Sequence, residues 1–323
     1  MIRWGLLIAL AAFAILAGIA LGPADISLGT VLRSLLRGGD ETSVAIVRQL
    51  RVPRALLAFV VGGCLAMTGA TLQALVRNPL ADPYLLGLSG GAGLGAVLAI
   101  ALRLPGSWAV PAAAFLGALI AIGLVYRLAL VAGAILDPRI LLLAGVVVSA
   151  FAGALLGAVI SLSPAAELRN AMLWLLGGFD AASWEALGLF SAYATPPALF
   201  LYYSSRPLDL LSLGEEPAQF LGTEVEPLKR RLYVAASLLT AACVAVSGII
   251  GFVGLVVPHA IRMVWGHAHR SLLPAAFLLG GTLLTVADAA ARTLFAPREL
   301  PVGVVTALVG VPVFAILLRR WAR

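Results

Sequence analysis

Long apolar runs alternate with short polar or proline-rich segments along most of this chain. Ten of these runs approach the length of about 20 residues that a helix needs to cross the hydrocarbon core of a bilayer. Residues 141–148 contain no polar side chain, so they lack the alternation of a membrane β-strand. The pattern predicts an all-α integral membrane protein with about ten transmembrane helices. The predicted spans lie near residues 4–22, 55–76, 84–102, 108–133, 140–162, 185–203, 232–250, 251–265, 271–295 and 301–318.

The eighth predicted span is short for a full crossing. Residues 248–259 read Gly-Ile-Ile-Gly-Phe-Val-Gly-Leu-Val-Val-Pro-His, and these glycines and the proline favour a broken helix packed inside the bundle. Nothing in the pattern divides the chain, so we expect one transmembrane domain over residues 1–323. An even number of spans places both ends on one side, and the larger share of basic residues predicts that this side is the cytoplasm.

A polar, acidic island at about residues 204–231 interrupts the apolar runs. It contains Gly214 followed by Glu215 and Glu216, with leucines on both sides. Acidic side chains are favourable in the first turn of a helix. The island therefore predicts two short helices joined by a turn, with apolar faces that fit a groove on a partner outside the bilayer. A solvated connecting loop is the alternative interpretation.

Composition agrees with a membrane location. Of the 323 residues, 62% are hydrophobic and 11% are charged, whereas about a quarter are charged in soluble domains. The net charge of +7 comes from basic residues scattered among loops, which indicates membrane orientation and headgroup contact rather than a nucleic-acid partner. The apolar amino-terminal run exceeds the roughly 7–15 residues typical of a cleaved signal, so we expect an uncleaved first span. Cys64 and Cys243 lie in apolar runs and are expected to be packing residues.

A basic patch on the predicted outer side opposes the positive-inside rule. Five arginines precede the second span, namely Arg33, Arg37, Arg48, Arg51 and Arg54. Near the outer end of the ninth span, Asp288 lies four residues before Arg292, so the two side chains share a helix face and can pair. Two interpretations are open. Arginines near span ends extend to the membrane interface, and their planar guanidinium groups also suit the carboxylates of a soluble partner.

The residues that usually carry chemistry are sparse. The glycines of residues 87–95 follow no strand and no phosphate-binding loop is present, so close helix packing explains them. His267 and His269 point to opposite sides of a helix, which disfavours a metal site. No nucleophile and base occur at a readable spacing, so we expect no enzyme. An intramembrane enzyme would need paired ionisable groups within the spans. An ion-coupled secondary transporter would need acidic residues near the membrane centre, and the spans contain almost none.

Seven blocks in collinear order resemble a known family, the permease subunits of the ABC importers that take up iron-siderophores, haem and cobalamin. One block begins with Arg51-Val-Pro-Arg54, and another reads Gly251-Phe-Val-Gly-Leu-Val-Val-Pro-His259. The resemblance spans nearly the whole chain. Its blocks occupy residues 51–63, 69–83, 85–93, 141–145, 213–222, 251–262 and 299–310.

The resemblance implies the fold of a type II ABC importer permease in the bacterial inner (cytoplasmic) membrane. It implies a homodimer with the substrate path between its two copies, two cytoplasmic ATPase subunits that bind ATP and Mg, and a periplasmic or lipid-anchored substrate-binding protein. This chain itself would bind no cofactor. The segment received by the ATPase would include Leu208, Leu211, Leu213, Gly214, Glu215, Glu216, Ala218, Leu221 and Gly222.

The resemblance also places roles outside that segment. Arg51, Arg54 and Arg292 match arginines that meet glutamates of the binding protein, and Asp137, Pro138 and Arg139 match the inner gate of the path. Some relatives have small hydroxyl residues at the gate, so this chain departs from them there. Residues 266–270, Gly-His-Ala-His-Arg, also depart from the family's frequent Asp-His-Arg. The expected cargo is an iron-siderophore or haem, with cobalamin as the alternative.

Overall fold

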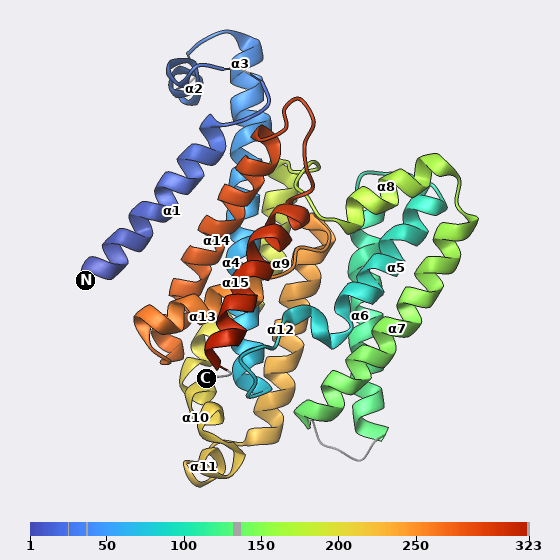
Figure 1. Cartoon of the computed structure of the whole chain (residues 1–323), viewed down its shortest axis with the longest axis vertical. Coiled ribbons are helices and arrows are strands. Elements are labelled where there is room, and N and C mark those ends of the chain that lie inside the picture. Colours follow the sequence, from blue (N-terminus) through green and yellow to red (C-terminus); the bar gives the residue numbers. More distant parts are fainter. Residues whose placement is uncertain (25, 37, 132–136, 322–323) are drawn as a thin grey trace.

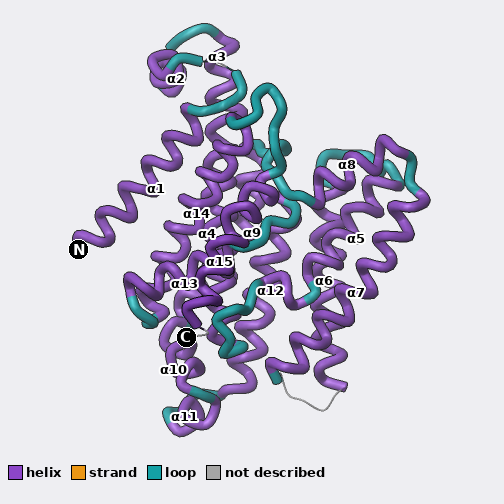
Figure 2. The backbone as a smooth tube through the Cα atoms, in the orientation of Figure 1, coloured by secondary structure: helices purple, strands orange, loops and turns teal. Residues whose placement is uncertain are grey.

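The computed structural model describes residues 1–24, 26–36, 38–131 and 137–321, and this part of the chain consists of helices joined by loops (Figure 2). Most of the ten predicted spans match one helix each, and the third begins with a short 3₁₀ turn. In chain order the elements are α1 (Ile2–Ala20), α2 (Leu28–Leu35), α3 (Glu41–Ala45), η1 (Ile46–Arg51), α4 (Val52–Leu75), η2 (Pro83–Leu86), α5 (Leu88–Ala101), α6 (Ala109–Val131), α7 (Pro138–Leu162), α8 (Ala165–Leu175), α9 (Trp184–Tyr203), α10 (Ser205–Leu213), α11 (Glu215–Phe220), α12 (Val225–Ser247), α13 (Val253–Trp265), α14 (His269–Thr293) and α15 (Val302–Trp321).

Six helical stretches in the described residues are long and apolar enough to cross a membrane. Five of them are single helices, namely α1, α6, α7, α12 and α14. The sixth is the continuous helical stretch Glu41–Leu75, which comprises α3, η1 and α4. The helices α5, α13 and most of α15 are apolar but shorter, and α9 contains Pro196 and Pro197. The all-α prediction is therefore confirmed, and the count of ten crossings stays a prediction.

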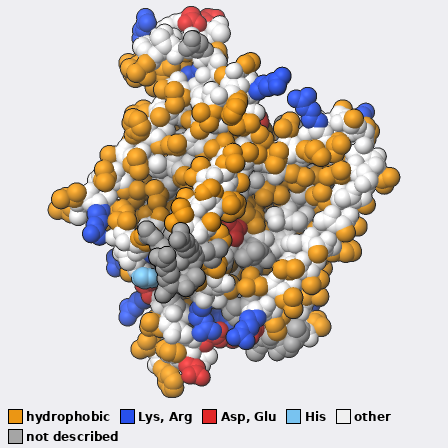
Figure 3. All heavy atoms as spheres, in the orientation of Figure 1, with side chains coloured by type: hydrophobic (Ala, Val, Ile, Leu, Met, Phe, Trp, Pro, Cys, Tyr) orange, Lys and Arg blue, Asp and Glu red, His pale blue; other side chains and the backbone are white. Residues whose placement is uncertain are grey.

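The long helices run between two ends of the molecule (Figure 1). One end carries α2, α3 and α8 and is called the α2–α8 end here; the opposite end carries α10 and α11 and is called the α10–α11 end. On the face shown in Figure 3, hydrophobic side chains cover the middle, and most charged side chains gather toward the two ends. Such a belt suits the hydrocarbon layer of a bilayer.

Helix α4 lies at the centre of the bundle, with most of its side chains buried. Its glycines allow neighbouring backbones to approach closely. A Cβ atom added at Gly62 would lie 2.4 Å from the carbonyl oxygen of Gly280 in α14, and one added at Gly69 would lie 1.9 Å from that of Gly254 in α13. Close van der Waals packing of this kind stabilises helix pairs in membranes, where no hydrophobic force drives them together.

The glycines of residues 87–95 have the same role, as predicted. Gly91 of α5 faces α6, where an added Cβ atom would lie 2.4 Å from the carbonyl oxygen of Gly117. Gly87 begins α5 with a φ of +82°, a conformation that glycine adopts without steric cost. This segment is therefore a helix-packing element.

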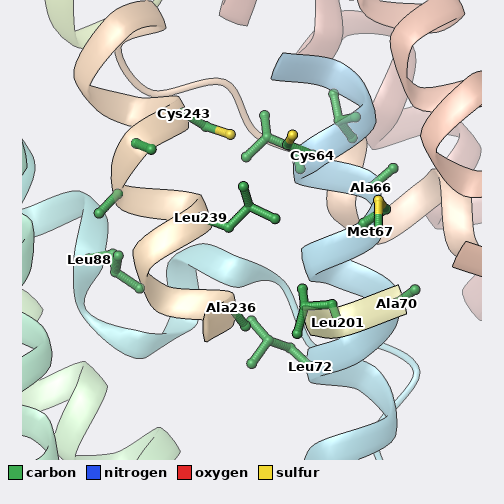
Figure 4. Packing of buried hydrophobic residues seen from close by; sticks show 14 of the residues in the cluster. Cys64, Ala66, Met67, Ala70, Leu72, Leu88, Leu201, Ala236, Leu239 and Cys243 are labelled. Carbon is green, nitrogen blue, oxygen red and sulfur yellow. The ribbon is translucent and has the colours of Figure 1, made fainter. Parts of the chain in front are cut away.

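Buried apolar side chains fill the space between α4 and α12 (Figure 4). Cys64 of α4 and Cys243 of α12 lie on facing helices, with Leu239 and, further along α4, Leu72 in the same cluster. Both cysteines are free thiols and buried. They contribute to packing, as their place in apolar runs predicts.

The predicted break lies between α12 and α13, where residues 248–252 are not helical. Backbone groups around the break bond to neighbouring irregular segments. The amide of Gly178 donates to the carbonyl of Ser247 at 2.8 Å, and the amide of Ile250 donates to the hydroxyl of Tyr84 at 3.2 Å. Irregular backbone is tolerated inside a membrane bundle because such partners replace water.

Candidate functional site

The polar island forms α10, α11 and the start of α12 at the α10–α11 end (Figure 1). Helix α10 ends at Leu213 and is followed by Gly214, whose φ of +128° is accessible chiefly to glycine. Glu215 and Glu216 then occupy the first turn of α11, where negative charge is favourable. Gly222, with a φ of +80°, follows α11. The two short helices expected from the sequence are present, and Gly214 is the turn between them.

One face of this segment packs against the bundle and the other is exposed. The buried members of the predicted set are Leu208, Leu211 and Ala218. The large exposed apolar side chains are Leu213, Phe220 and Leu221, at 68%, 91% and 63%. Large apolar side chains clustered at one end of a molecule are typical of an interaction surface. Leu213, Phe220 and Leu221 therefore form an exposed apolar surface, called the apolar tip here, on a segment whose opposite face is buried.

Ion pairs attach α11 to α12. The side chain of Lys229 is 3% exposed, and its Nζ lies 3.2 Å from Glu215 Oε1 and 3.0 Å from Glu226 Oε1. A buried ammonium group without such partners would be costly. Arg77 contributes weakly, because its Nη2 is 3.9 Å from the same Glu215 oxygen. Glu216 is exposed, so the two glutamates have different surroundings although they are adjacent in sequence.

Helix α10 is attached to the start of α14. Asp209 Oδ1 accepts hydrogen bonds from the backbone amide of His269 at 2.8 Å and from its Nδ1 at 2.6 Å. Hydrogen bonds to a carboxylate are stronger than those between neutral groups. The segment is therefore fixed from two directions, by α12 and by α14.

A second cluster of charges lies toward the α2–α8 end, around Arg54 of α4. Its guanidinium group is bound by Asp288 of α14 at 3.0 Å, by Glu299 at 2.9 Å and by Asp180 at 3.2 Å. The side chain of Arg54 is 14% exposed and that of Asp288 is 0% exposed, whereas Asp180 remains 81% exposed. Three carboxylates, one buried, one partly exposed and one exposed, thus hold the same arginine.

Arg51 lies at the end of η1 and is 4% exposed. Its Nη1 donates to the carbonyl oxygen of Ala20 at 2.7 Å and its Nη2 to that of Ala24 at 2.6 Å. The last carbonyl groups of a helix have no partner within the helix and carry partial negative charge. Arg51 therefore stabilises the carboxyl-terminal end of α1 and the chain that follows it.

Arg292 of α14 binds the same end of α1 and is 2% exposed. It donates to the carbonyl oxygens of Gly18 and Leu21, at 2.9 Å each. Its Nε lies 3.0 Å from Asp288 Oδ2, so the ion pair predicted from the four-residue spacing is confirmed. Asp288 consequently bridges two arginines inside the protein.

These positions bear directly on the predicted docking arginines. The structure brings Arg51, Arg54 and Arg292 together at one end, but it buries Arg51 and Arg292 and directs their guanidinium groups to α1. Their contact with a partner's glutamates stays a prediction. Of the other arginines in the basic patch, Arg33 is exposed, Arg48 is partly buried, and Arg37 lies outside the described residues.

The predicted gate lies at the start of α7. Asp137 caps this helix, because its Oδ1 accepts a hydrogen bond of 2.8 Å from the amide of Arg139. Pro138 is the first residue of α7, and its side chain lies outside the described part of the chain, as do residues 132–136. The gate role stays a prediction.

Sequence reasoning missed several members of these clusters. Glu299 and Asp180 were not expected beside Arg54, and Asp209 was not expected beside His269. Each pair is far apart in sequence, 245 residues in the case of Arg54 and Glu299, so no local spacing marks them. The available signal is weak: Asp180 and Glu299 lie in the segments between predicted spans.

Comparison with known proteins agrees with this architecture. Residues 9–320 match the model of the FecCD transport family. The chain belongs to the FecCD transport family. The hemin transport system permease protein HmuU of Yersinia pestis is 42% identical over 94% of this chain and 92% of its own length. The cobalamin import system permease protein BtuC of Halobacterium salinarum is 43% identical over 87% of this chain and 75% of its own.

A solved structure supports the same assignment. It shows an inward-facing conformation of an ABC transporter assigned to the metal-chelate type, with a TM-score of 0.88 and 31% identity over 99% of each chain. The family prediction from the sequence blocks is therefore confirmed. These FecCD relatives are transport permeases, and the apolar helices with their charged ends give the chain the character of a multi-pass membrane protein.

Proposed function

We propose that this chain is the membrane-spanning permease subunit of an ATP-driven importer for a metal chelate, either an iron-siderophore or haem. The observation that carries the proposal is similarity over the full length to a transporter of the metal-chelate type, joined by 42% identity to a hemin permease. Cobalamin is the alternative cargo, favoured by a cobalamin permease that is 43% identical.

The assembly follows from the same proposal. Ten helices cross the inner membrane, and both termini lie in the cytoplasm on the side of α10 and α11. Two copies of the chain enclose the substrate path, with the turn at residues 137–139 as its inner gate. Two separate ATPase subunits bind ATP and Mg and hydrolyse the ATP, so this chain is a transport subunit without an enzymatic role.

The apolar tip of α10 and α11 is the part of the chain that the ATPase receives. Support comes from its shape: Leu213, Phe220 and Leu221 are exposed while Lys229 and His269 hold the base in place. A movement of the ATPase would then be transmitted to α12 and α14 through the ion pairs, because these bonds resist displacement of the segment alone.

The α2–α8 end is where a periplasmic or lipid-anchored binding protein docks. Of the three arginines, Arg54 is the one that a partner's carboxylate reaches most readily, because Asp180 on its outer side is 81% exposed. A glutamate of the binding protein would replace Asp180 at the guanidinium group. Arg51 and Arg292 would act indirectly, by holding the end of α1 beside this surface.

Reconstitution tests the proposal. The chain is placed in liposomes with its co-encoded ATPase and binding protein, and ATP-dependent uptake of a ferric siderophore, haem and cobalamin is compared. Uptake of one compound, abolished by an ATPase variant unable to hydrolyse ATP, identifies the cargo. Uptake that follows a proton gradient after ATP depletion, or hydrolysis of ATP by the purified chain alone, would refute the proposal.

A further inference from the structure

A cavity of about 400 Å³ opens at the α10–α11 end, between the end of α4, helix α10, helix α13 and the start of α14. Its lining includes the cationic or titratable side chains Arg77, His259, Arg262, His267 and His269, and none of its lining residues is acidic. Cavities lined by one sign of charge concentrate ions of the opposite sign. The charge of this lining therefore favours an anion.

Arg262 of α13 is partly buried and lines this cavity without a carboxylate partner. Its Nη1 donates to the side-chain carbonyl of Gln73, a neutral group. The amide of Gln73 donates in turn to the carbonyl oxygens of Gly254 and Leu255, at 3.4 Å each, which orients the oxygen toward Arg262. In the part of the chain that the structure describes, no ion pair compensates this guanidinium group. A partly desolvated cation of this kind gains from a bound anion.

His269 provides a second, independent observation. The residue is 3% exposed, and its ring is fixed because Nδ1 lies 2.6 Å from Asp209 Oδ1. Its other nitrogen, Nε2, is buried and has no hydrogen-bond partner among the described residues. A buried polar atom without a partner is unfavourable, because it has lost its hydrogen bonds to water. Arg262 and His269 line the same cavity.

We propose that this cavity binds a phosphate-class oxyanion. Guanidinium groups match phosphate oxygens with paired donors, and Arg262 from α13 and Arg77 after α4 approach from different elements. A planar carboxylate offers two oxygens, whereas a phosphate offers oxygens in several directions and so suits donors that approach from different elements. Nε2 of the neutral imidazole accepts a hydrogen bond from the P–OH group of a monohydrogen phosphate. A lipid phosphodiester has no such hydroxyl group and requires the protonated imidazole, whose Nε2 donates.

Two sources supply this chemistry, a free phosphate in solution and the headgroup phosphate of a lipid. The site is independent of the cargo proposed above. It does connect to α10, because the imidazole that would hold the anion also holds Asp209 of that helix. An occupied cavity would therefore strengthen the attachment of α10 to α14.

The test uses the full chain in nanodiscs and two ligand arms. In discs of phosphatidylcholine alone, radiolabelled inorganic phosphate is titrated by equilibrium dialysis. In discs that also contain phosphatidylglycerol, native mass spectrometry measures how much of that lipid the chain retains. The variant Arg262→Gln removes the uncompensated charge, and Arg77→Gln is the second variant, because Arg77 is exposed and tolerates change. Arg230→Gln is the matched control, an exposed arginine that does not line the cavity.

We expect saturable binding at one site per chain in at least one arm. Both cavity variants should weaken it roughly tenfold or more, while Arg230→Gln leaves it unchanged. Phosphate binding in phosphatidylcholine discs identifies a free anion, and retention of phosphatidylglycerol alone identifies a lipid. Absence of both, or equal loss in all three variants, overturns the proposal. If neither ligand binds and Arg262→Gln also assembles less well with the ATPase, the proposal is overturned and the cavity belongs to the ATPase contact.

Discussion

Arg292 of α14 donates a hydrogen bond of 2.9 Å to the carbonyl oxygen of Leu21, a residue 271 positions earlier in the chain. Arg51 donates to the neighbouring carbonyl oxygen, that of Ala20, at 2.7 Å. Two buried guanidinium groups therefore hold the end of α1 against α4 and α14. This arrangement gives both arginines a structural role within the chain, whatever partner approaches the surface above them.

The first prediction concerns that structural role. Arg292→Met removes both carbonyl contacts and one partner of Asp288, while Arg54 still neutralises the buried carboxylate. We expect the free energy of unfolding to fall by about 3 kcal/mol, because charged hydrogen bonds inside a protein are lost. Denaturant titration of the purified chain in mixed micelles measures the change.

Arg298→Met is the control for this variant, because Arg298 is exposed at the same end of the molecule. Its free energy of unfolding should change by less than about 0.5 kcal/mol. If Arg292→Met unfolded like the unaltered chain, the end of α1 would be held by other contacts, and the guanidinium group would be available to a partner.

The second prediction separates the two adjacent glutamates of α11. Glu215→Lys places a second ammonium group beside buried Lys229, so the unfolding temperature and the affinity for the ATPase should both fall. Glu216→Lys alters an exposed charge and should weaken ATPase binding about fivefold, with the unfolding temperature unchanged. Glu224→Lys, also exposed at this end, is the control. Equal effects of Glu215→Lys and Glu216→Lys on the unfolding temperature would show that Glu215 does not tether α11.

The third prediction concerns the apolar tip. Phe220→Ser and Leu213→Ser should each weaken assembly with the ATPase roughly tenfold, because buried aromatic and aliphatic anchors carry much of the energy of an interface. Neither change should alter the folding of the chain alone, since both side chains are exposed. Leu36→Ser changes an equally exposed leucine at the opposite end and should leave assembly intact. Co-purification at graded ATPase concentrations measures the difference, and undiminished assembly would move the contact elsewhere.

Element positions could be predicted where length alone decides them. The run predicted at residues 108–133 is α6, Ala109–Val131, because a bilayer requires about 20 apolar residues. The short helix α8, Ala165–Leu175, was missed because no such requirement applies to it. Helix α9 contains Pro196 and Pro197 and is not among the six described stretches that are long and apolar enough to cross, so it is a weaker candidate for a crossing than its length suggests.

Charge pairing could be predicted only within one helix. The four-residue spacing of Asp288 and Arg292 places them on one face, and the structure contains their ion pair. The burial of Arg51 could not be predicted, because its partners are carbonyl groups of α1 and backbone atoms leave no mark in a sequence. The sequence pattern therefore predicts an exposed positive surface on the outer side, although the guanidinium groups of Arg51 and Arg292 bind α1 inside the protein.

The last prediction concerns the close contact of α4 with α13. A Cβ atom at Gly69 would lie 1.9 Å from the carbonyl oxygen of Gly254, whereas one at Gly157 of α7 meets nothing within 4 Å. Gly69→Ala forces the two backbones apart, so the free energy of unfolding should fall by about 1–3 kcal/mol. Gly157→Ala should raise it by up to about 1 kcal/mol, because alanine favours the helix. The same chemical change is thus expected to have opposite signs at the two positions, and denaturant titration of both variants distinguishes them. Equal shifts would mean that α4 and α13 are not in backbone contact at Gly69.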